Sequence, residues 1–282
     1  MTYTYETIST EIKNKVLYAT IGNPPINLID QAFVRDLVGL LGELDTDPNV
    51  RVVVFRSADP DFFIPHVDLL HIAEYTAEAA RSGGPDDVNL GALLRRLSEA
   101  RQVTITVLEG RAGGAGHEFA LATDMRFASR ERAVISQPEA AFGVFPGAGA
   151  VQHITRLAGR GNAMQVLLAA EDWRADDAER IGLVNRSLPD ANLLPYVTTL
   201  AERIANFPEG SVRLIKRRIN AIALPPREDM QVDGSMFAVL ARDPEVAKRM
   251  KFFMPRGLQT RSRTELELGE ALAEYTEEPA AQ

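Results

Sequence analysis

Hydrophobic and polar positions along the first half of the chain switch repeatedly between two patterns. Short apolar runs bounded by turn-forming residues are typical of strands, and longer segments with apolar side chains every three or four positions are typical of amphipathic helices. Gln31–Leu44 and Leu90–Leu97 show the helical pattern. The strand pattern is found at residues 3–8, 14–21, 50–55, 103–108, 125–129 and 133–136. This alternation predicts a layered α/β body.

From Gly147 onward the pattern is almost entirely helical. The predicted helices are residues 147–158, 160–170, 190–206, 208–223, 228–241 and 244–253. Phe207-Pro208 falls between two strongly periodic helices, and proline favours a helix break because it has no N–H donor. We therefore expect a core of residues 1–206 that holds the functional site, followed by a helical C-terminal region of residues 207–282.

Three segments are expected to lie outside regular structure. Thr10–Lys13 is polar and predicts a turn between the first two strands. Residues 76–87 contain the run Ser-Gly-Gly-Pro-Asp-Asp, which predicts a mobile loop. The last residues, 276–282, are expected to be disordered.

Composition narrows the class of protein. The chain has 282 residues, of which 45% are hydrophobic and 25% charged, as is ordinary for a globular protein. Its net charge of −8 argues against nucleic-acid binding, which needs a basic face. The absence of cysteine removes disulfides and thiolate chemistry and fits a reducing compartment. With no signal peptide at residues 1–10 and no apolar stretch of the roughly 18 residues that span a membrane, we expect a soluble, cytoplasmic protein.

The segment from Val103 to Asp124 carries the most informative local pattern. An apolar strand is followed by a turn with glycines at positions 110, 113, 114 and 116, and then by a helix that is expected to open at Glu118. Glycine lets backbone N–H groups point into open space, and the helix behind the turn adds the positive end of its dipole. Such a turn suits an anion, which is either a bound phosphate or the oxyanion of a transition state.

A nucleotide-binding loop does not fit this turn. The dinucleotide fingerprint needs a third glycine where Phe119 stands, and the Gly-Lys-Ser/Thr sequence of a phosphate-binding loop is missing. A second segment favours proton chemistry instead, because Pro138 stiffens the turn before Glu139 and a glycine-rich run follows from Phe142 to Gly149. Two glutamates beside constrained turns are suited to moving protons to and from water. Their separation in sequence does not by itself bring them together in space.

Taken together, these motifs resemble those of the crotonase family, also called the enoyl-CoA hydratase/isomerase family. The resemblance spans about residues 10–205 and implies an α/β fold, a spiral of ββα units with a helical C-terminal region that forms trimers or dimers of trimers. The motifs that carry it, in order, are Asn23-Pro-Pro-Ile-Asn27, residues 50–57 with Asp61-Phe-Phe, Asp68-Leu69, the turn before Glu118, Gln137-Pro138-Glu139, Pro146–Gly149 and residues 175–184 with Ile181-Gly-Leu-Val.

The resemblance also implies chemistry. The backbone amides of Val67 and Ala115 would form an oxyanion hole for the enolate of a coenzyme A thioester, and Glu118 and Glu139 would act as acid and base in adding water to an α,β-unsaturated acyl-CoA. Coenzyme A would be part of the substrate, with no other cofactor and no metal. The residues expected to bind the substrate are Pro65, His66, Asp68, Gly114, His117 and Phe142.

Several positions depart from the family pattern and leave more than one function possible. Pro65-His66-Val67-Asp68 stands where Ala-Gly-Ala-Asp is usual, Ala115 replaces a common glycine, and His117 precedes the first glutamate. Histidine titrates near neutrality and can act as a base. Some members of the family that the chain resembles use histidines to cleave the C–C bond of a β-diketone without coenzyme A, so the resemblance also leaves this hydrolase function open. The same motifs are compatible with a double-bond isomerase and with a binding scaffold that has lost its chemistry.

Overall fold

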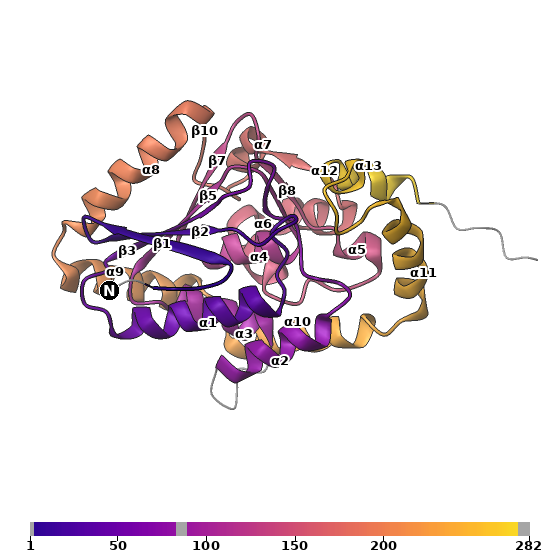
Figure 1. Ribbon diagram of the computed structural model, residues 1–282, viewed down its shortest axis with the longest axis horizontal. Coiled ribbons are helices and arrows are strands. Elements are labelled where there is room, and N and C mark those ends of the chain that lie inside the picture. Colours follow the sequence, from indigo (N-terminus) through magenta and orange to yellow (C-terminus); the bar gives the residue numbers. More distant parts are fainter. Residues whose placement is uncertain (1–2, 83–88, 276–282) are drawn as a thin grey trace, which may run out of the picture.

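The computed structural model describes residues 3–82 and 89–275 of the chain (Figure 1). Within this part, two sheets form the centre of the molecule. The six-stranded sheet has the order β1 (Ile8–Lys13), β2 (Val16–Ile21), β3 (Val52–Ser57), β5 (Val103–Leu108), β7 (Met125–Ser129) and β10 (Arg186–Leu188). The four-stranded sheet has the order β4 (Phe62–Ile64), β6 (Arg111–Gly113), β8 (Val134–Ser136) and β9 (Trp173–Arg174).

Consecutive strands of the chain are divided between the two sheets. In each repeating unit the first strand joins the larger sheet and the second joins the smaller one, and a helix follows. The strands β3, β5 and β7 are parallel neighbours, as are β4, β6 and β8. The helices that follow the three units are α2 (Ile72–Ser82) with α3 (Leu90–Ser98), α4 (Ala115–Ala122) and α5 (Glu139–Phe142). This repetition is the expected crotonase-like spiral of ββα units, and the predicted fold class is confirmed.

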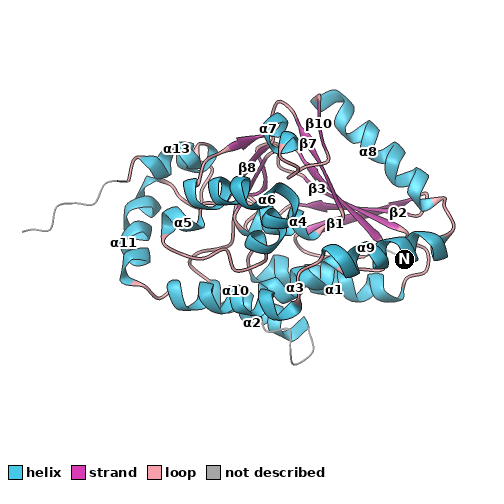
Figure 2. Cartoon of the chain, turned by 180° about the vertical axis from the view of Figure 1, so that it is seen from behind, coloured by secondary structure: helices cyan, strands magenta, loops and turns pink. Residues whose placement is uncertain are grey.

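Helices cover both faces of the six-stranded sheet (Figure 2). On one face, Val52, Val54 and Ile105 pack against α8 (Asp190–Ala205). On the other, Leu17 and Phe55 belong to the large core that includes α1 (Gln31–Thr46), α3 and α4. Because helices cover both faces, nearly every residue of the central strands β3 and β5 is buried, including the polar Thr104 and Thr106 of β5.

The remaining helices wrap around this body. They are α6 (Ala150–Ala169), α7 (Ala175–Arg180), α9 (Glu209–Ala223), α10 (Arg227–Leu240), α11 (Pro244–Phe253), α12 (Arg263–Leu266) and α13 (Leu268–Ala273), with the 3-10 turn η1 (Met254–Arg256). Figure 1 shows α11, α12 and α13, drawn in yellow, beside α5 on one side of the molecule, opposite the N-terminus. The backbone leaves helical geometry at Gly159 inside α6, in agreement with the two helices predicted on either side of it.

Three predicted elements were wrong at the N-terminus and around α2. The first strand is β1, so the predicted strand 3–8 lies too early and Thr10–Lys13 is strand rather than turn. The chain reverses at Asn14 and Lys15, which both adopt left-handed backbone conformations suited to a two-residue hairpin. Residues 76–82 are helical and not loop, because Tyr75 and Ala79 bury one face of α2 in the core. The rest of that predicted loop, and the predicted disordered tail 276–282, lie outside the described residues.

The predicted helical region was also wrong at two short strands. Trp173–Arg174 and Arg186–Leu188 form strands at the edges of the two sheets, in a part of the chain that was expected to be nearly all helix. The glycine-rich turn ends earlier than predicted, because α4 begins at Ala115 and contains Glu118 in its first turn. Between the predicted core and C-terminal region, α8 ends at Ala205 and α9 begins at Glu209. The division into residues 1–206 and 207–282 stays a prediction.

A very close backbone approach in the core involves Gly116 of α4. A methyl group at this position would lie 1.9 Å from the carbonyl oxygen of Ile64 in β4, and backbone atoms on both sides leave no room to yield. We therefore expect Gly116→Ala to lower the free energy of unfolding by about 2 kcal/mol or more, as forced overpacking does. Urea denaturation followed by circular dichroism measures this effect.

Gly161 in α6 is the matched control, because a methyl group there would meet no atom within 4 Å. Gly161→Ala should leave stability unchanged or raise it slightly, since alanine favours the helix. Equal stability of the two variants would contradict the close contact at Gly116.

Candidate active site

The candidate site lies where β4 and β6 leave the smaller sheet. Ile64 pairs with Ala112 in the parallel register, and Val67 and Ala115 are each three residues further along their chains. The two segments touch through main-chain atoms, since a methyl group on Gly113 would lie 2.6 Å from the Pro65 carbonyl oxygen. Only glycine permits this contact, so the turn brings the loop that carries Val67 next to the start of α4.

Two backbone amides remain unused at this junction. Val67 lies opposite Ile29 in an isolated parallel β-bridge, whose hydrogen bonds are made by the residues on either side of Val67. The Ile29 N–H donates to the His66 carbonyl at 3.0 Å, and the Asp68 N–H donates to the Ile29 carbonyl at 2.9 Å. The Val67 N–H and that of Ala115, the first residue of α4, have no hydrogen-bond partner among residues 3–82 and 89–275. Free N–H groups at a helix start are suited to an electronegative oxygen.

Gly114 shapes the turn before α4. Its φ of +49° lies in the region that favours glycine, and its N–H donates to the Ser136 carbonyl of β8 at 3.1 Å. A methyl group at this position would lie 2.6 Å from Oε1 of Glu139. The carboxylate of Glu139 therefore lies directly over the glycine-rich turn.

Glu118 is buried beneath the same turn and held at one oxygen. Its Oε1 accepts hydrogen bonds from the N–H groups of Ala148 and Ala150, at 2.8 and 3.0 Å, where α6 begins. Burial raises the pKa of Glu118 from its ordinary 4.5 to about 7, although these amide hydrogen bonds oppose the change. The glycine-rich run before α6 thus serves as the anchor of the first glutamate.

Glu139 is the first residue of α5 and is only partly exposed, with its Oε2 buried and without a hydrogen-bond partner in the described chain. Burial, and then the charge of Glu118, raise the pKa of Glu139 well above its ordinary value. Electrostatic repulsion between the two carboxylates means that they lie close enough for the protonation of one to depend on the other. The two residues are 21 positions apart in the sequence, and the fold places both beside Gly114.

The other predicted substrate-binding residues have varied surroundings. Phe142 is buried in the C-terminal apolar cluster, with its ring centroid 5.4 Å from that of Phe253. Asp68 accepts hydrogen bonds from Gln259 and His71, and these bonds hold the pKa of its carboxyl below the ordinary value although partial burial opposes them. Pro65 contributes the carbonyl that packs on Gly113. Their roles in substrate binding stay predictions.

The two histidines near the site are both engaged. His66 contacts the Val67 carbonyl through Nδ1 at 2.7 Å and Glu265 Oε1 through Nε2 at 2.8 Å. His117 is fully buried and its Nδ1 lies 3.0 Å from Nε2 of Gln137. Burial, aided by the charge of Arg126, lowers the pKa of His117 to about 3, so the ring is neutral.

Glu265 and Gln259 were missed by the sequence analysis. Both lie near the C-terminus yet contact the loop of residues 66–69, and 199 positions of sequence separate Glu265 from its partner His66. No local sequence signal marks either residue, because a glutamate in a short polar helix is usually solvated. Only the folded chain brings them to the site.

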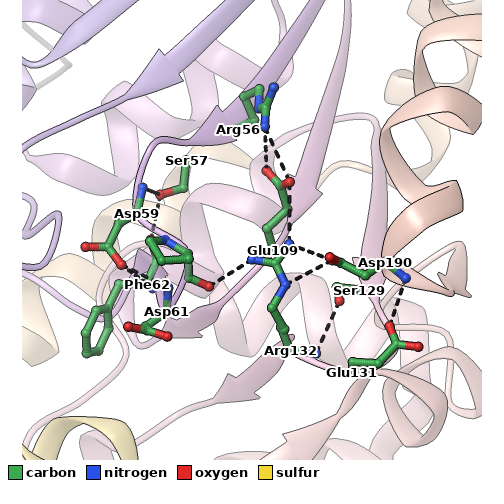
Figure 3. A network of polar contacts seen from close by, with 11 residues as sticks. Arg56, Ser57, Asp59, Asp61, Phe62, Glu109, Ser129, Glu131, Arg132 and Asp190 are labelled. Atoms are coloured by element: carbon green, nitrogen blue, oxygen red, sulfur yellow. Dashed lines mark hydrogen bonds and ion pairs between the residues drawn. The ribbon is translucent and has the colours of Figure 1, made fainter.

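A surface network of ion pairs and hydrogen bonds stabilises the turn from β3 to β4, which leads into the loop that carries Val67 (Figure 3). Arg56 and Arg132 approach the carboxylate of Glu109 from two sides, and Arg132 also binds Asp190 and the carbonyl of Pro60. Ser57 donates to the Phe62 carbonyl at 2.6 Å and closes the turn from β3 to β4. These contacts hold the end of β3 and the start of β4 in a fixed relation.

A large groove lies elsewhere on the described chain. It has a volume of about 880 Å³ between the end of α3 and α9, and its lining includes Arg101, Arg213 and Leu214. Neither glutamate lines it, and we place the chemistry at the two carboxylates beside the glycine-rich turn, because the pKa of each is raised and the charge of Glu118 acts on Glu139. The groove instead borders the exposed apolar residues of α9.

Comparison with known proteins identifies the family of the chain. The profile of the enoyl-CoA hydratase/isomerase family matches residues 11–258. The short-chain-enoyl-CoA hydratase of Clostridium acetobutylicum is 31% identical over 211 residues, which cover 74% of this chain and 79% of the relative. The crotonyl-CoA hydratase of Syntrophomonas wolfei is 32% identical over 231 residues, covering 81% of this chain and 84% of the relative.

A solved structure agrees over almost the full length. A Streptomyces avermitilis protein provisionally described as an enoyl-CoA hydratase superposes with a TM-score of 0.96 at 50% identity, covering 98% of this chain and 100% of that one. The fold and these relatives define a hydratase-like enzyme with the crotonase fold. The chain belongs to the enoyl-CoA hydratase/isomerase family.

The raised pKa of Glu118 makes stability depend on pH. Between about 4.5 and about 7 the Glu118 carboxyl binds more protons in the folded protein than in the unfolded chain, so its contribution to stability falls as pH rises through this window. Glu118→Gln keeps an oxygen for the amides of Ala148 and Ala150 but cannot ionise. We expect its stability relative to the wild type to increase by about 1–3 kcal/mol between pH 5 and pH 8, measured by urea denaturation.

Glu11 on the exposed side of β1 is the control. Glu11→Gln should follow the wild type at both pH values. A Glu118→Gln variant whose relative stability stays constant with pH would show that Glu118 titrates at its ordinary pKa.

Proposed function

We propose that this protein adds water across the double bond of an α,β-unsaturated acyl-CoA. The observation that carries the proposal is the pair of glutamates, Glu118 and Glu139, buried beside two unused backbone amides and each with a raised pKa. Near neutrality such a pair holds a proton on one carboxyl and a charge on the other, because each charge disfavours the second. One acid and one base are what hydration requires.

The proposed reaction is balanced by these groups. The thioester carbonyl oxygen accepts hydrogen bonds from the N–H groups of Val67 and Ala115, which stabilise the negative charge that builds up as the enolate forms. The ionised glutamate takes a proton from water while the oxygen of that water bonds to the β-carbon. The protonated glutamate gives its proton to the α-carbon, and the double bond becomes a single bond. The pair then exchanges protons with solvent or product to regain its starting state.

Coenzyme A enters as part of the substrate, and the proposal requires no other cofactor. The relatives named for short-chain-enoyl-CoA and crotonyl-CoA support an acyl-CoA substrate with a short acyl group as the first compound to test. The amides of Val67 and Ala115 would determine where its carbonyl group sits. The residues proposed to surround the acyl group and the thioester are Pro65, His66, Asp68, Gly114, His117 and Phe142.

Hydrolysis of a C–C bond receives no specific support. It depends on His66 or His117 acting as a base. Both ring nitrogens of His66 are already engaged, by the Val67 carbonyl and by Glu265, and burial lowers the pKa of His117 to about 3, which makes it a weak base. Double-bond isomerisation uses the same enolate and only one of the two glutamates. The presence of both glutamates favours hydration over isomerisation.

We also propose that the protein forms a trimer or a dimer of trimers through its C-terminal helices. No residue of α9 is buried, and its apolar side chains face solvent in the single chain. Exposed apolar patches of this kind are typical of protein interfaces. The exposed apolar residues of α9 and α10 are Leu214, Ile215, Ile219, Ile222, Val232, Met236, Val239 and Leu240.

We propose a cytoplasmic location. The residues that the structure describes contain no helix with the length and apolar character needed to cross a bilayer. The absence of cysteine from the sequence fits a reducing compartment such as the cytoplasm. Fractionation of cells that make the protein tests it directly.

The glutamates are tested by hydration of crotonyl-CoA. We expect Glu118→Gln and Glu139→Gln each to lower kcat by about 100- to 10,000-fold, the range over which a positioned acid or base acts. Loss of the ultraviolet absorbance of the conjugated thioester is a direct assay for consumption of the double bond. Circular dichroism of the variants monitors the fold.

Glu11→Gln serves again as the exposed control and should keep the wild-type kcat. If either active-site variant retained full turnover while the wild type hydrated crotonyl-CoA, the acid–base assignment would be wrong.

The assembly is tested by light scattering after size-exclusion chromatography. The wild type is expected to have the mass of a trimer or hexamer, and Ile215→Lys combined with Ile219→Lys in α9 should produce smaller species, because two charges would be buried at the interface. A wild-type protein that elutes as a monomer at micromolar concentration would refute this part of the proposal.

A further inference from the structure

Residues 259–265 near the C-terminus form hydrogen bonds to the loop that carries Val67. Gln259 accepts a hydrogen bond from the Leu69 N–H at 2.7 Å and donates one to Asp68 Oδ1 at 2.9 Å. Arg261 binds Asp59 and Asp61 on the turn before β4. The same short stretch of chain therefore contacts the loop on both sides of Val67.

The polar groups around the Val67 α-carbon can be accounted for completely. Two peptide units flank it and offer four groups: the His66 carbonyl, the Val67 N–H, the Val67 carbonyl and the Asp68 N–H. The first and last are paired with Ile29 of the neighbouring segment. The Val67 carbonyl is paired with Nδ1 of His66 at 2.7 Å. Of these four groups, only the Val67 N–H lacks a partner in the described chain.

The His66 ring links this peptide to Glu265. Both ring nitrogens face acceptors, the Val67 carbonyl and Glu265 Oε1, so both carry protons and the ring is an imidazolium. Asp68 on the same loop adds a second negative charge near the ring, and Arg111 of β6, paired with Asp172, lies on the far side of Glu265. Burial lowers the pKa of His66, but Glu265, the Val67 carbonyl and Asp68 together outweigh it and hold the pKa above its ordinary value.

We propose that Glu265 is a positioning residue for the Val67 amide, acting through the His66 imidazolium to fix the peptides from which that amide projects. This inference rests on the proposed function, in which the Val67 N–H binds the substrate carbonyl. Glu265 contacts no reacting atom. Its negative charge keeps both nitrogens of the His66 ring protonated, so that the ring can donate to Glu265 on one side and to the Val67 carbonyl on the other.

A carboxylate is needed at this place because its negative charge keeps both nitrogens of the His66 ring protonated. Glu265 Oε1 accepts from Nε2 of His66 at 2.8 Å and from the Gln259 N–H at 2.5 Å. If a glutamine at position 265 places its oxygen where Oε1 lies, a neutral His66 donates from Nε2 to that oxygen, and its unprotonated Nδ1 then faces the Val67 carbonyl, so two acceptors meet. If the amide is flipped, its NH2 group faces the Gln259 N–H, so two donors meet. Glu265→Gln thus loses at least one hydrogen bond whenever His66 is neutral.

The test compares Glu265→Gln with Glu267→Gln. Glu267 lies two positions further along and pairs with the exposed Arg263, so its variant removes one negative charge without altering the contacts of His66. Hydration of crotonyl-CoA is measured from about pH 6 to about pH 9. In parallel, ring 15N shifts are recorded for the chain's four histidines and the amide shift is recorded for Val67.

In Glu265→Gln, burial without the neighbouring charge lowers the pKa of His66, so the ring is neutral at pH 8 and charged only in acid. Because loss of a complete oxyanion donor costs about 100- to 1,000-fold, we expect a displaced one to lower kcat about tenfold at pH 8 with little change in KM. Relative to the wild type at the same pH, the rate should recover as the pH falls. The Val67 amide should shift at pH 8, and Glu267→Gln should match the wild type throughout.

Other results overturn the inference. A Glu265→Gln variant with the wild-type pH profile, an equal loss at every pH, or an unmoved Val67 amide would each do so. If Glu265→Gln does not fold, Glu265→Asp replaces it: the charge stays but the reach is one carbon shorter, so the Val67 amide should shift with His66 still protonated. An unshifted amide in that variant contradicts the inference.

Failure of the proposed function gives a different result. A wild type that turns over no enoyl-CoA refutes hydration, and the NMR measurements then decide alone whether Glu265 controls the His66 ring and the Val67 peptide.

Discussion

The geometry of the whole candidate site depends on one main-chain contact. It joins β4 and the loop that follows it to the glycine-rich turn. At Gly113 and Gly116 a single methyl group would collide with the carbonyls of Pro65 and Ile64. Because no side chain separates the two segments, the amides of Val67 and Ala115 lie at equivalent positions, each three residues after the paired residues Ile64 and Ala112. The ββα repeat supplies this arrangement by making β4 and β6 parallel neighbours.

Electrostatics at the site follows from the same compact packing. Burial raises the pKa of Glu118 to about 7, burial and the charge of Glu118 raise the pKa of Glu139 well above its ordinary value, and burial lowers the pKa of His117 to about 3. Burial acts in the same physical way on all three residues, by disfavouring the charged form. The outcome differs because a carboxyl is neutral when protonated and an imidazole is neutral when deprotonated. The glutamates therefore become usable for proton transfer at neutral pH, and the histidine does not.

Much of the fold could be predicted because its signals are local. The long apolar strands, the glycine-rich turn and the break in α6 at Gly159 each leave a mark within a few residues of sequence. The motifs also led to the correct family and fold class. The errors arose where tertiary packing decides: α2 is helical because Tyr75 and Ala79 are buried, and the aromatic residues near Tyr3 resemble a strand but precede one. The ββα repeat itself is carried by strand pairing and leaves no recurring sequence motif.

For the candidate site, the sequence indicated Glu118, Glu139 and the amides of Val67 and Ala115, but none of the residues that hold them in place. The amides of Ala148 and Ala150 that hold Glu118 lie at the glycine-rich entry to α6, which was predicted as a family motif and as the start of a helix but not as a support for Glu118. Glu265 could not be predicted, since its contact with His66 spans 199 positions of sequence. That span has a consequence for biosynthesis. A ribosome makes the loop 199 residues before Glu265, so the nascent core can collapse while His66 still lacks its counter-ion, and the site reaches its final form only after Glu265 has left the ribosome.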